Sequence, residues 1–252
     1  MRFASLGSGS RGNATLVEEG DTCLLVDCGF SVREAEARLT RLGKSAQQLT
    51  AVLVTHEHGD HINGVGALAR KYGLPVWATG GTLAADRLGE RVETQRICSH
   101  SAFAVGAIEV QPFPVPHDAR EPSQFVFANG DRRLGLLTDV GSYTPHLEAC
   151  LSGCHALILE CNHDYQLLQQ GEYPPSLKRR VGGDHGHLSN AQAATILERL
   201  DKTQLTQLVA AHLSEKHNTP SLARQALAEV LGCAPDWIAV AQQDTGLEWR
   251  DV

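Results

Sequence analysis

One short segment constrains this 252-residue chain most strongly, because it concentrates metal-binding side chains directly after an apolar strand. The strand is predicted over Ala51–Thr55, and the segment reads Thr55-His56-Glu57-His58-Gly59-Asp60-His61. The pattern His-x-His-x-Asp-His is expected by chance only about 0.001 times in a chain of this composition. The sequence therefore predicts a metal site, and the alternative is a solvated polar loop.

The spacing within this segment indicates two ions. In an extended loop, residues two apart point the same way, so His56 and His58 can converge on one ion. Gly59 permits a sharp turn that swings Asp60 and His61 toward a second ion. Imidazole and carboxylate ligands together suit Zn²⁺, Mn²⁺ or Fe better than Ca²⁺.

Three more residues of metal-binding type follow predicted strands further along the chain. They are His117, Asp139 and His212. Each alone is weak evidence, because a single His or Asp at a strand end is more often a loop or capping residue, but together with the first motif they supply two coordination spheres. Asp139 is best placed to bridge them, because one carboxylate offers an oxygen to each metal.

The order of elements predicts an α/β fold in one domain, residues 1–252. Two blocks each begin with strands and end with helix–strand alternation, which fits two mixed β-sheets packed face to face with helices outside. Expected strands are Arg2–Leu6, Ala14–Glu18, Thr22–Asp27, Ala51–Thr55, Leu74–Ala78, Ile108–Val115, Phe125–Ala128, Leu134–Thr138, Ala156–Glu160, Leu205–Ala211 and Trp237–Ala241. Expected helices are Val32–Leu42, Gly64–Tyr72, Thr82–Leu88, His146–Leu151, Asn190–Leu200 and Ser221–Leu231.

Composition excludes several classes of protein. The N-terminus lacks a secretory apolar region, and no apolar run reaches the roughly 18 residues of a membrane span, so no membrane association is expected. Seven cysteines without a CxxC pair indicate reduced, buried thiols and a cytoplasmic location. The net charge of −7 argues against non-specific coating of nucleic acid, although a local basic groove remains compatible with it.

With these residues in view, the chain resembles the metallo-β-lactamase-fold hydrolase superfamily, and the resemblance runs across nearly its whole length. It implies a four-layer αββα sandwich holding two divalent metal ions, Zn²⁺ or Mn²⁺ with Fe possible. His56, His58 and His117 would bind one ion, Asp60, His61 and His212 the other, and Asp139 both. The resemblance further implies that Asp27 hydrogen-bonds a ligand histidine from behind and fixes its orientation. As a lone residue, Asp27 is equally explained as a turn residue ending a strand.

Four further motifs resemble the YycJ/WalJ branch of bacterial phosphodiesterases and 5′→3′ exodeoxyribonucleases. They read SGSRGN, ECNHD, HGHLSN and HLSEKHNTP. This resemblance implies a dinuclear phosphodiesterase whose substrate is nucleic acid, most simply DNA, attacked by a metal-bridging hydroxide. Asp60 is expected to belong to the catalytic centre.

A possible proton donor comes from a second resemblance, to the transfer-RNA 3′-processing endonuclease of the superfamily. There a Glu and a His form a dyad beside the metals, and the matching pair is Glu160 and His187. A histidine oriented by a carboxylate can donate a proton to the leaving oxygen. The alternative role for His187 is to cap the following helix.

Substrate contacts are expected from three groups of residues. The Gly/Ser loop with Ser8, Ser10 and Asn13 can cradle a phosphate, although such loops are more often plain turns. Asn162, His163, His185 and Asn218 follow strands or flank the expected ligands. Lys178, Arg179 and Arg180 form a basic run that suits phosphate, with a solvated loop as an equal reading.

Other activities stay open at this stage. A small cyclic phosphodiester would suit a short acidic chain. An RNA-processing role is weakened because no long insertion separates Asp139 from His212, and thioester hydrolysis does not need the Glu160/His187 pair. A metal-binding module without catalysis is disfavoured because every expected ligand is present. Metal identity, strand polarity and oligomeric state are not specified by the sequence.

Overall fold

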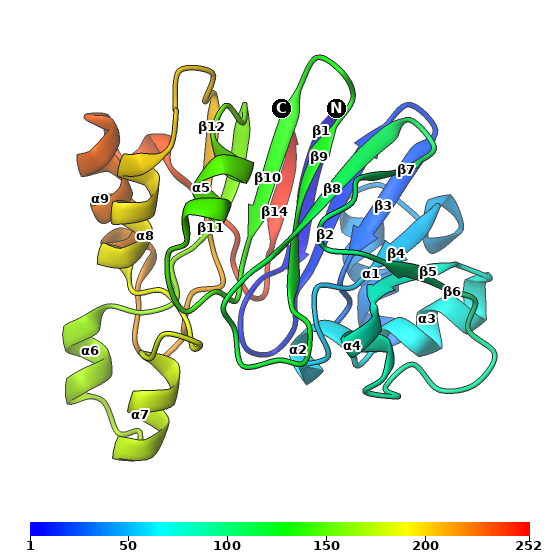
Figure 1. Ribbon diagram of the computed structural model, residues 1–252, viewed down its shortest axis with the longest axis horizontal. Helices are drawn as coiled ribbons and strands as arrows, with labels where there is room; N and C mark the ends of the chain where they lie inside the picture. Colours follow the sequence, from blue (N-terminus) through cyan, green and yellow to red (C-terminus); the bar gives the residue numbers. More distant parts are fainter.

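The computed structural model describes residues 1–252 as two seven-stranded sheets packed face to face, with helices covering both outer sides (Figure 1). The two chain ends lie side by side in the middle of the sandwich (Figure 1), where the amide of Val252 donates to the carbonyl of Met1 at 3.0 Å. The expected α/β sandwich of two mixed sheets is confirmed. None of the helices combines the length and apolar character that crossing a membrane requires.

The first sheet has the strand order β14-β1-β2-β3-β4-β5-β6. Its strands are β1 (Arg2–Gly7), β2 (Ala14–Glu19), β3 (Thr22–Val26), β4 (Ala51–Leu53), β5 (Val76–Thr79), β6 (Thr94–Ile97) and β14 (Leu247–Asp251). The strands from β3 to β6 run parallel, and β1, β2 and β14 add antiparallel pairings. Its helical segments are α1 (Val32–Arg41), α2 (Gly59–Ile62), α3 (Val65–Tyr72), α4 (Gly80–Leu83) and the 3₁₀ turn Ala46–Gln48.

The second sheet has the order β13-β12-β11-β10-β9-β8-β7. Its strands are β7 (Phe103–Val105), β8 (Ile108–Pro114), β9 (Ser123–Ala128), β10 (Arg133–Leu137), β11 (Ala156–Glu160), β12 (Gln207–Ala211) and β13 (Ala239–Val240). The strands from β10 to β13 run parallel, and β7 to β10 are antiparallel. Its helical segments are α5 (Pro145–Leu151), α6 (Tyr165–Gln170), α7 (Pro175–Val181), α8 (Asn190–Arg199), α9 (Pro220–Leu231) and the 3₁₀ turn Pro235–Trp237.

Apolar side chains from both sheets fill the space between them. Phe3 and Leu24 from the first sheet and Phe125, Phe127 and Ile158 from the second belong to one buried cluster. Two further buried clusters are present, one between each sheet and its own helices. Truncating one buried phenylalanine to alanine costs about 3–5 kcal/mol of stability, so this inter-sheet layer fixes how the two halves meet.

Most expected elements are present, but several expectations are wrong. The helix expected over Thr82–Leu88 is instead the short α4, which is capped by Thr79 and ends before Asp86, a residue with left-handed backbone (φ 53°). The strand expected over Trp237–Ala241 is reduced to β13 because a 3₁₀ turn occupies Pro235–Trp237. Strands β6, β7 and β14 and helices α2, α6 and α7 were not expected. All seven cysteines are free, but Cys98 is exposed and Cys233 is partly exposed, so the expectation of seven buried thiols is wrong for these two.

The parallel strands of the two sheets end at one common edge of the sandwich. The loops after β3 and β4 come from the first sheet, and those after β10, β11 and β12 from the second. Ligand sites in α/β sheets form at the carboxyl ends of strands. This edge therefore collects the polar side chains that the sequence places after each strand.

Candidate metal centre

Three residues of this edge have left-handed backbone conformations. Asp27, Asp139 and His212 have φ values of 60°, 51° and 55°, and each lies one or two residues after the end of a strand. Non-glycine residues in this region cost of order 1–3 kcal/mol each and cluster at functional sites. The abrupt turn directs each side chain from its strand end toward the space between the two sheets.

The first histidine cluster contains His56, His58 and His117, whose ligand-type atoms all lie within 4.8 Å of one another. The Nδ1 atom of His117 donates to the carbonyl of Gly186 at 3.0 Å, and the Nε2 atom of His58 donates to the carbonyl of Asp118 at 3.2 Å. A carbonyl oxygen only accepts, so each contact fixes the ring's tautomer.

The consequence of those tautomers is a pair of facing lone pairs. The unprotonated atoms, Nε2 of His117 and Nδ1 of His58, lie 3.2 Å apart. Between two neutral rings this contact is repulsive, and a cation between the nitrogens makes it attractive. The Nε2 atom of His56 is also buried without a hydrogen-bond partner.

The second cluster contains Asp60, His61, Asp139 and His212, again within 4.8 Å of one another. The Oδ2 atom of Asp139 lies 3.0 Å from Nε2 of His61 and 2.9 Å from Nδ1 of His212. Both Asp139 Oδ2 and His212 Nδ1 nevertheless lack a hydrogen bond of acceptable geometry. Buried polar atoms in proteins are nearly always paired, so these unpaired atoms indicate a site for an ion.

Asp27 lies behind this cluster and holds it in place. Its Oδ2 atom lies 2.8 Å from Nδ1 of His61, and the backbone and hydroxyl of Thr55 each donate to its carboxylate at 2.8 Å. The contact turns the opposite nitrogen of His61 toward Asp139. This contact is of the kind that the family resemblance implies for Asp27, and the orienting role stays a prediction.

Protonation states differ between residues of the two clusters when no metal is bound. Burial, together with the charge of His61, holds the pKa of His56 well below its usual range, so this ring is neutral. Burial alone would raise the pKa of Asp139, but the charges of His212 and His61 hold it well below its usual range. Burial lowers the pKa of His61, but the charges of Asp139 and Asp27 outweigh it and hold that pKa well above its usual range. Neutral imidazole and ionised carboxylate are the forms that bind metals, so His56 and Asp139 are ready to bind, whereas binding at His61 would release a proton.

Glu160 and His187 form a second polar unit beside the clusters. Oε1 of Glu160 lies 2.7 Å from Nδ1 of His187, while Oε2 accepts from the amides of Val140 and Leu188 at 3.0 and 3.1 Å. Burial lowers the pKa of His187, but the charge and hydrogen bond of Glu160 outweigh it and raise the pKa to about 9. The helix α8 is capped by Ser189, so the alternative reading of His187 as its capping residue is wrong.

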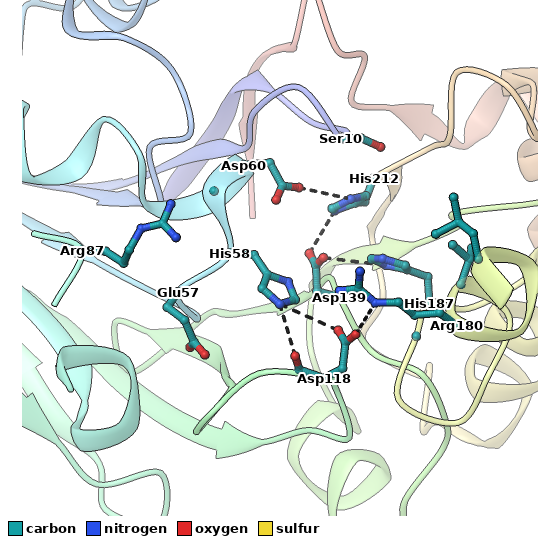
Figure 2. Close-up of a pocket in the computed structure, with 14 residues that line it drawn as sticks. Ser10, Glu57, His58, Asp60, Arg87, Asp118, Asp139, Arg180, His187 and His212 are labelled. Carbon is teal, nitrogen blue, oxygen red and sulfur yellow. Dashed lines mark hydrogen bonds and ion pairs between the residues drawn. The ribbon is translucent and has the colours of Figure 1, made fainter. Parts of the chain in front are cut away.

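A pocket of about 420 Å³ opens onto these groups (Figure 2). Its walls include one or more residues from each cluster, and Ser10 and Arg180 from the expected substrate contacts. Sequence reasoning missed other wall residues, notably Glu57, Arg87, Asp118 and Leu177. No local pattern marks Arg87 or Leu177, whereas Glu57 and Asp118 adjoin expected ligands and could have been considered.

The remaining expected substrate contacts lie away from the pocket wall. Ser8 accepts from the amide of His212, and Asn13 donates to the carbonyl of Gly9 and lies 3.1 Å from His61. Asn162 donates to the carbonyl of His212, Asn218 pairs with Asn190, His163 is buried, and Lys178 binds the carbonyl of Gln169. His185 and Arg179 are exposed. The basic run lies on α7, so its reading as a loop is wrong.

One segment carries several of these features. Between His163 and Ser189, which form an isolated parallel bridge, the chain makes an excursion through α6 and α7. Figure 1 shows these two helices projecting beyond the body of the sandwich. The excursion, residues 164–187, supplies Arg180 to the pocket wall, the carbonyl of Gly186 to His117, and His187 itself.

Comparison with known proteins agrees with this arrangement. Residues 22–212 match the family model described as a beta-lactamase superfamily domain. Exodeoxyribonuclease YycJ from Bacillus anthracis is 39% identical over 235 residues, covering 92% of this chain and 89% of that protein. Anti-Pycsar protein Apyc1 from a Paenibacillus species is 41% identical over 210 residues, 71% of this chain and 82% of that protein. The crystal structure of the metallo-β-lactamase fold protein YhfI from Bacillus subtilis superposes with a TM-score of 0.75 at 19% identity, over 99% of this chain and 98% of that one.

Proposed function

The chain belongs to the metallo-β-lactamase-fold hydrolase superfamily, in the branch that contains exodeoxyribonuclease YycJ, and from this membership we propose that it is a metal-dependent DNA nuclease. The proposal specifies a 5′→3′ exodeoxyribonuclease that uses two divalent cations, Zn²⁺ or Mn²⁺. Its principal support is the 3.2 Å contact between the unprotonated nitrogens of His58 and His117, which a cation would relieve.

The residues present fit two ions. The histidines of the first cluster would hold one, and Asp60, His61 and His212 the other. Asp139 would contact both, since its Oδ2 atom lies beside His61 and His212 and its Oδ1 atom lies 3.9 Å from Nε2 of His117. Divalent ions bound there would supply Lewis-acid activation of water and of the phosphoryl oxygens.

The chain itself supplies the proton for the leaving group. His187 is partly exposed to the pocket, and no hydrogen bond engages its Nε2 atom, because Glu160 holds only the opposite nitrogen. Two backbone amides fix Glu160 in turn, so the ring cannot swing away. From this position His187 would donate a proton to the departing oxygen of the substrate.

Phosphate binding would fall to residues on the pocket wall. Ser10 lies at the tip of the loop between β1 and β2, and Arg180 projects from α7. Hydroxyl and guanidinium donors both suit phosphate oxygens. Ser8 and Asn13 would act indirectly, by holding His212 and the loop around Asp60.

A second candidate is hydrolysis of a small cyclic phosphodiester. The pocket volume of about 420 Å³ matches a ligand of nucleotide size, and the same metal centre would serve. The DNA proposal is preferred because similarity to YycJ extends over 92% of the chain.

One assay tests both candidates. The protein is stripped with a chelator and reconstituted with Mn²⁺ or Zn²⁺, then given single- and double-stranded DNA labelled at either end, beside a cyclic mononucleotide. We expect metal-dependent release of short 5′-terminal products, with a 5′ label released before a 3′ label. Hydrolysis of the cyclic compound without cleavage of either DNA would replace the nuclease proposal with the second candidate.

A further inference from the structure

Two arginines line the metal pocket from opposite sides. Arg87 comes from the loop after α4, on the first-sheet half of the molecule, and Arg180 comes from α7, on the second-sheet half. Figure 2 shows them on either side of His58 and Asp139. Neither the sequence motifs nor the expected ligand set includes Arg87.

The backbone around Arg87 is held on both sides. Asp86 before it has a left-handed conformation (φ 53°), and Leu88 after it is buried. The carbonyl of Leu88 accepts from Nη1 of Arg70 at 2.6 Å, and a side chain at Gly66 would collide with that carbonyl. Arg87 therefore projects from an anchored turn.

Each guanidinium is steadied by one neighbour and keeps other donors free. Nη2 of Arg87 donates to Oδ1 of Asn63 at 2.8 Å, and Nε of Arg180 donates to Oδ2 of Asp118 at 2.6 Å. No other hydrogen bond engages either group, and the side chain of Arg180 is 63% exposed. Guanidinium groups have five N–H donors, so most remain available to a ligand.

The charges of the pocket indicate what that ligand is. Four carboxylates line it: Glu57, Asp60, Asp118 and Asp139. Two divalent cations would balance them, which leaves the two arginines as net positive charge at opposite walls. That distribution suits an anion extending past the metals in both directions.

We propose that Arg87 and Arg180 form a two-sided phosphate clamp that binds the backbone phosphates flanking the scissile one. The clamp rests on the proposed nuclease function and specifies its substrate as a polynucleotide strand. A cyclic mononucleotide carries a single phosphate, which would lie at the metals and leave both arginines without a partner. Asp118 and Asn63 are positioning residues, because they hold the guanidinium groups.

Binding measurements test the clamp directly. The probe is a fluorescent single-stranded DNA with phosphorothioate linkages, which keep their charge and resist cleavage, and its affinity for the metal-loaded protein is measured by anisotropy across salt concentrations. The variants are Arg87→Ala, Arg180→Ala and both together. Arg132→Ala is the matched control, because this exposed arginine lies in the β9–β10 turn, at the end of those strands remote from the pocket.

The clamp predicts a loss of one phosphate contact per arginine. Each pocket variant should weaken binding about tenfold and reduce the slope of log affinity against log salt by about 0.7, with the double variant losing both contributions. Arg132→Ala should keep the wild-type slope. Neutral methylphosphonates then locate the contacts: neutralising one flanking phosphate should cost Arg87→Ala nothing further, and neutralising the opposite one should cost Arg180→Ala nothing further.

The outcomes separate the clamp from the nuclease proposal. If the wild-type protein cleaves DNA but Arg87→Ala keeps the wild-type salt slope, the clamp is wrong and the nuclease function stands. The clamp is also wrong if both variants are insensitive to the same methylphosphonate. If the wild-type protein hydrolyses only the cyclic compound, the nuclease proposal fails and the clamp fails with it.

Discussion

The Nε2 atom of His117 lies 3.2 Å from the Nδ1 atom of His58, and when both rings are neutral neither of these nitrogens carries a proton. The other nitrogen of each ring donates a hydrogen bond to a backbone carbonyl: His117 to that of Gly186 and His58 to that of Asp118. In the neutral rings two nitrogen lone pairs therefore face each other and repel. A cation bound between them would replace this repulsion with attraction.

This relationship predicts strong stabilisation by metal. Adding Mn²⁺ or Zn²⁺ to chelator-treated protein should raise its unfolding free energy by about 2.7 kcal/mol for each ion bound, once free metal reaches about 100 times the Kd of that site. Differential scanning calorimetry over a metal titration measures this, and Ca²⁺ serves as a control that should shift the melting temperature less. An unfolding curve unaffected by any transition metal would contradict the assignment.

Asp139→Asn should remove both ions, because Oδ2 of Asp139 lies 3.0 Å from Nε2 of His61 in one cluster and Oδ1 lies 3.9 Å from Nε2 of His117 in the other. We expect bound metal per chain, measured by elemental analysis, to fall from two toward zero and DNA cleavage to fall by several orders of magnitude. Asp131→Asn is the control, since this exposed residue of the β9–β10 turn carries the same charge change. Retention of two ions in Asp139→Asn would refute the shared role.

His187→Ala should slow cleavage of DNA by about 10²–10⁴-fold while metal content stays near two per chain. The loss should be much smaller with a p-nitrophenyl phosphodiester, because nitrophenolate departs without a proton. His100→Ala, an exposed histidine outside the pocket, is the matched control. Equal losses on the two substrates would argue against proton donation.

Gly186→Ala tests the support behind His117. A Cβ at this position would collide with the carbonyls of Arg180 and Val181, so the Gly186 carbonyl must move away from Nδ1 of His117. Loss of such an orienting contact lowers metal affinity about 10–100-fold, measurable by competition with a chelating dye. Gly182→Ala is the control, because a Cβ there meets only ordinary contacts; equal affinities in the two variants would contradict the role.

Acid stability should depend on Glu18, far from the metal centre. Burial raises its pKa, but hydrogen bonds from Lys44 and Arg2 outweigh burial and lower the pKa below the usual value. The ionised form thus stabilises the fold above the unfolded-state pKa of about 4.3, and this contribution is lost as pH falls through the lower folded-state pKa.

Glu18→Gln should therefore lower the unfolding free energy by about 1 kcal/mol at pH 7, with the difference shrinking to nothing under strongly acidic conditions. Urea denaturation at several pH values measures it. Glu109→Gln, an exposed site on β8, should show little difference at any pH. A deficit in Glu18→Gln that persists unchanged in acid would mean that packing, not charge, is responsible.

The sequence predicts the buried strands and the residues that follow them better than it predicts the exposed elements. The expected ligands follow apolar strands within a few residues, so local patterning was sufficient to predict that His56, Asp139 and His212 lie at one edge of the sheets. The strand β6 has three exposed residues of four, and α7 buries none, so neither shows an apolar periodicity to detect. Arg87 reaches the pocket only through tertiary structure, by the contact of its loop with Gly66.

The excursion at residues 164–187 links three features of the site that could otherwise change independently. It contributes a wall of the pocket, the carbonyl that orients His117 and the imidazole of His187. A relative that remodels this stretch to admit a differently shaped molecule must also reset its metal affinity and its proton delivery. Chimaeras should accordingly exchange the whole stretch as one cassette, because a graft of α6 and α7 alone would separate the new wall from the atoms that tune the chemistry.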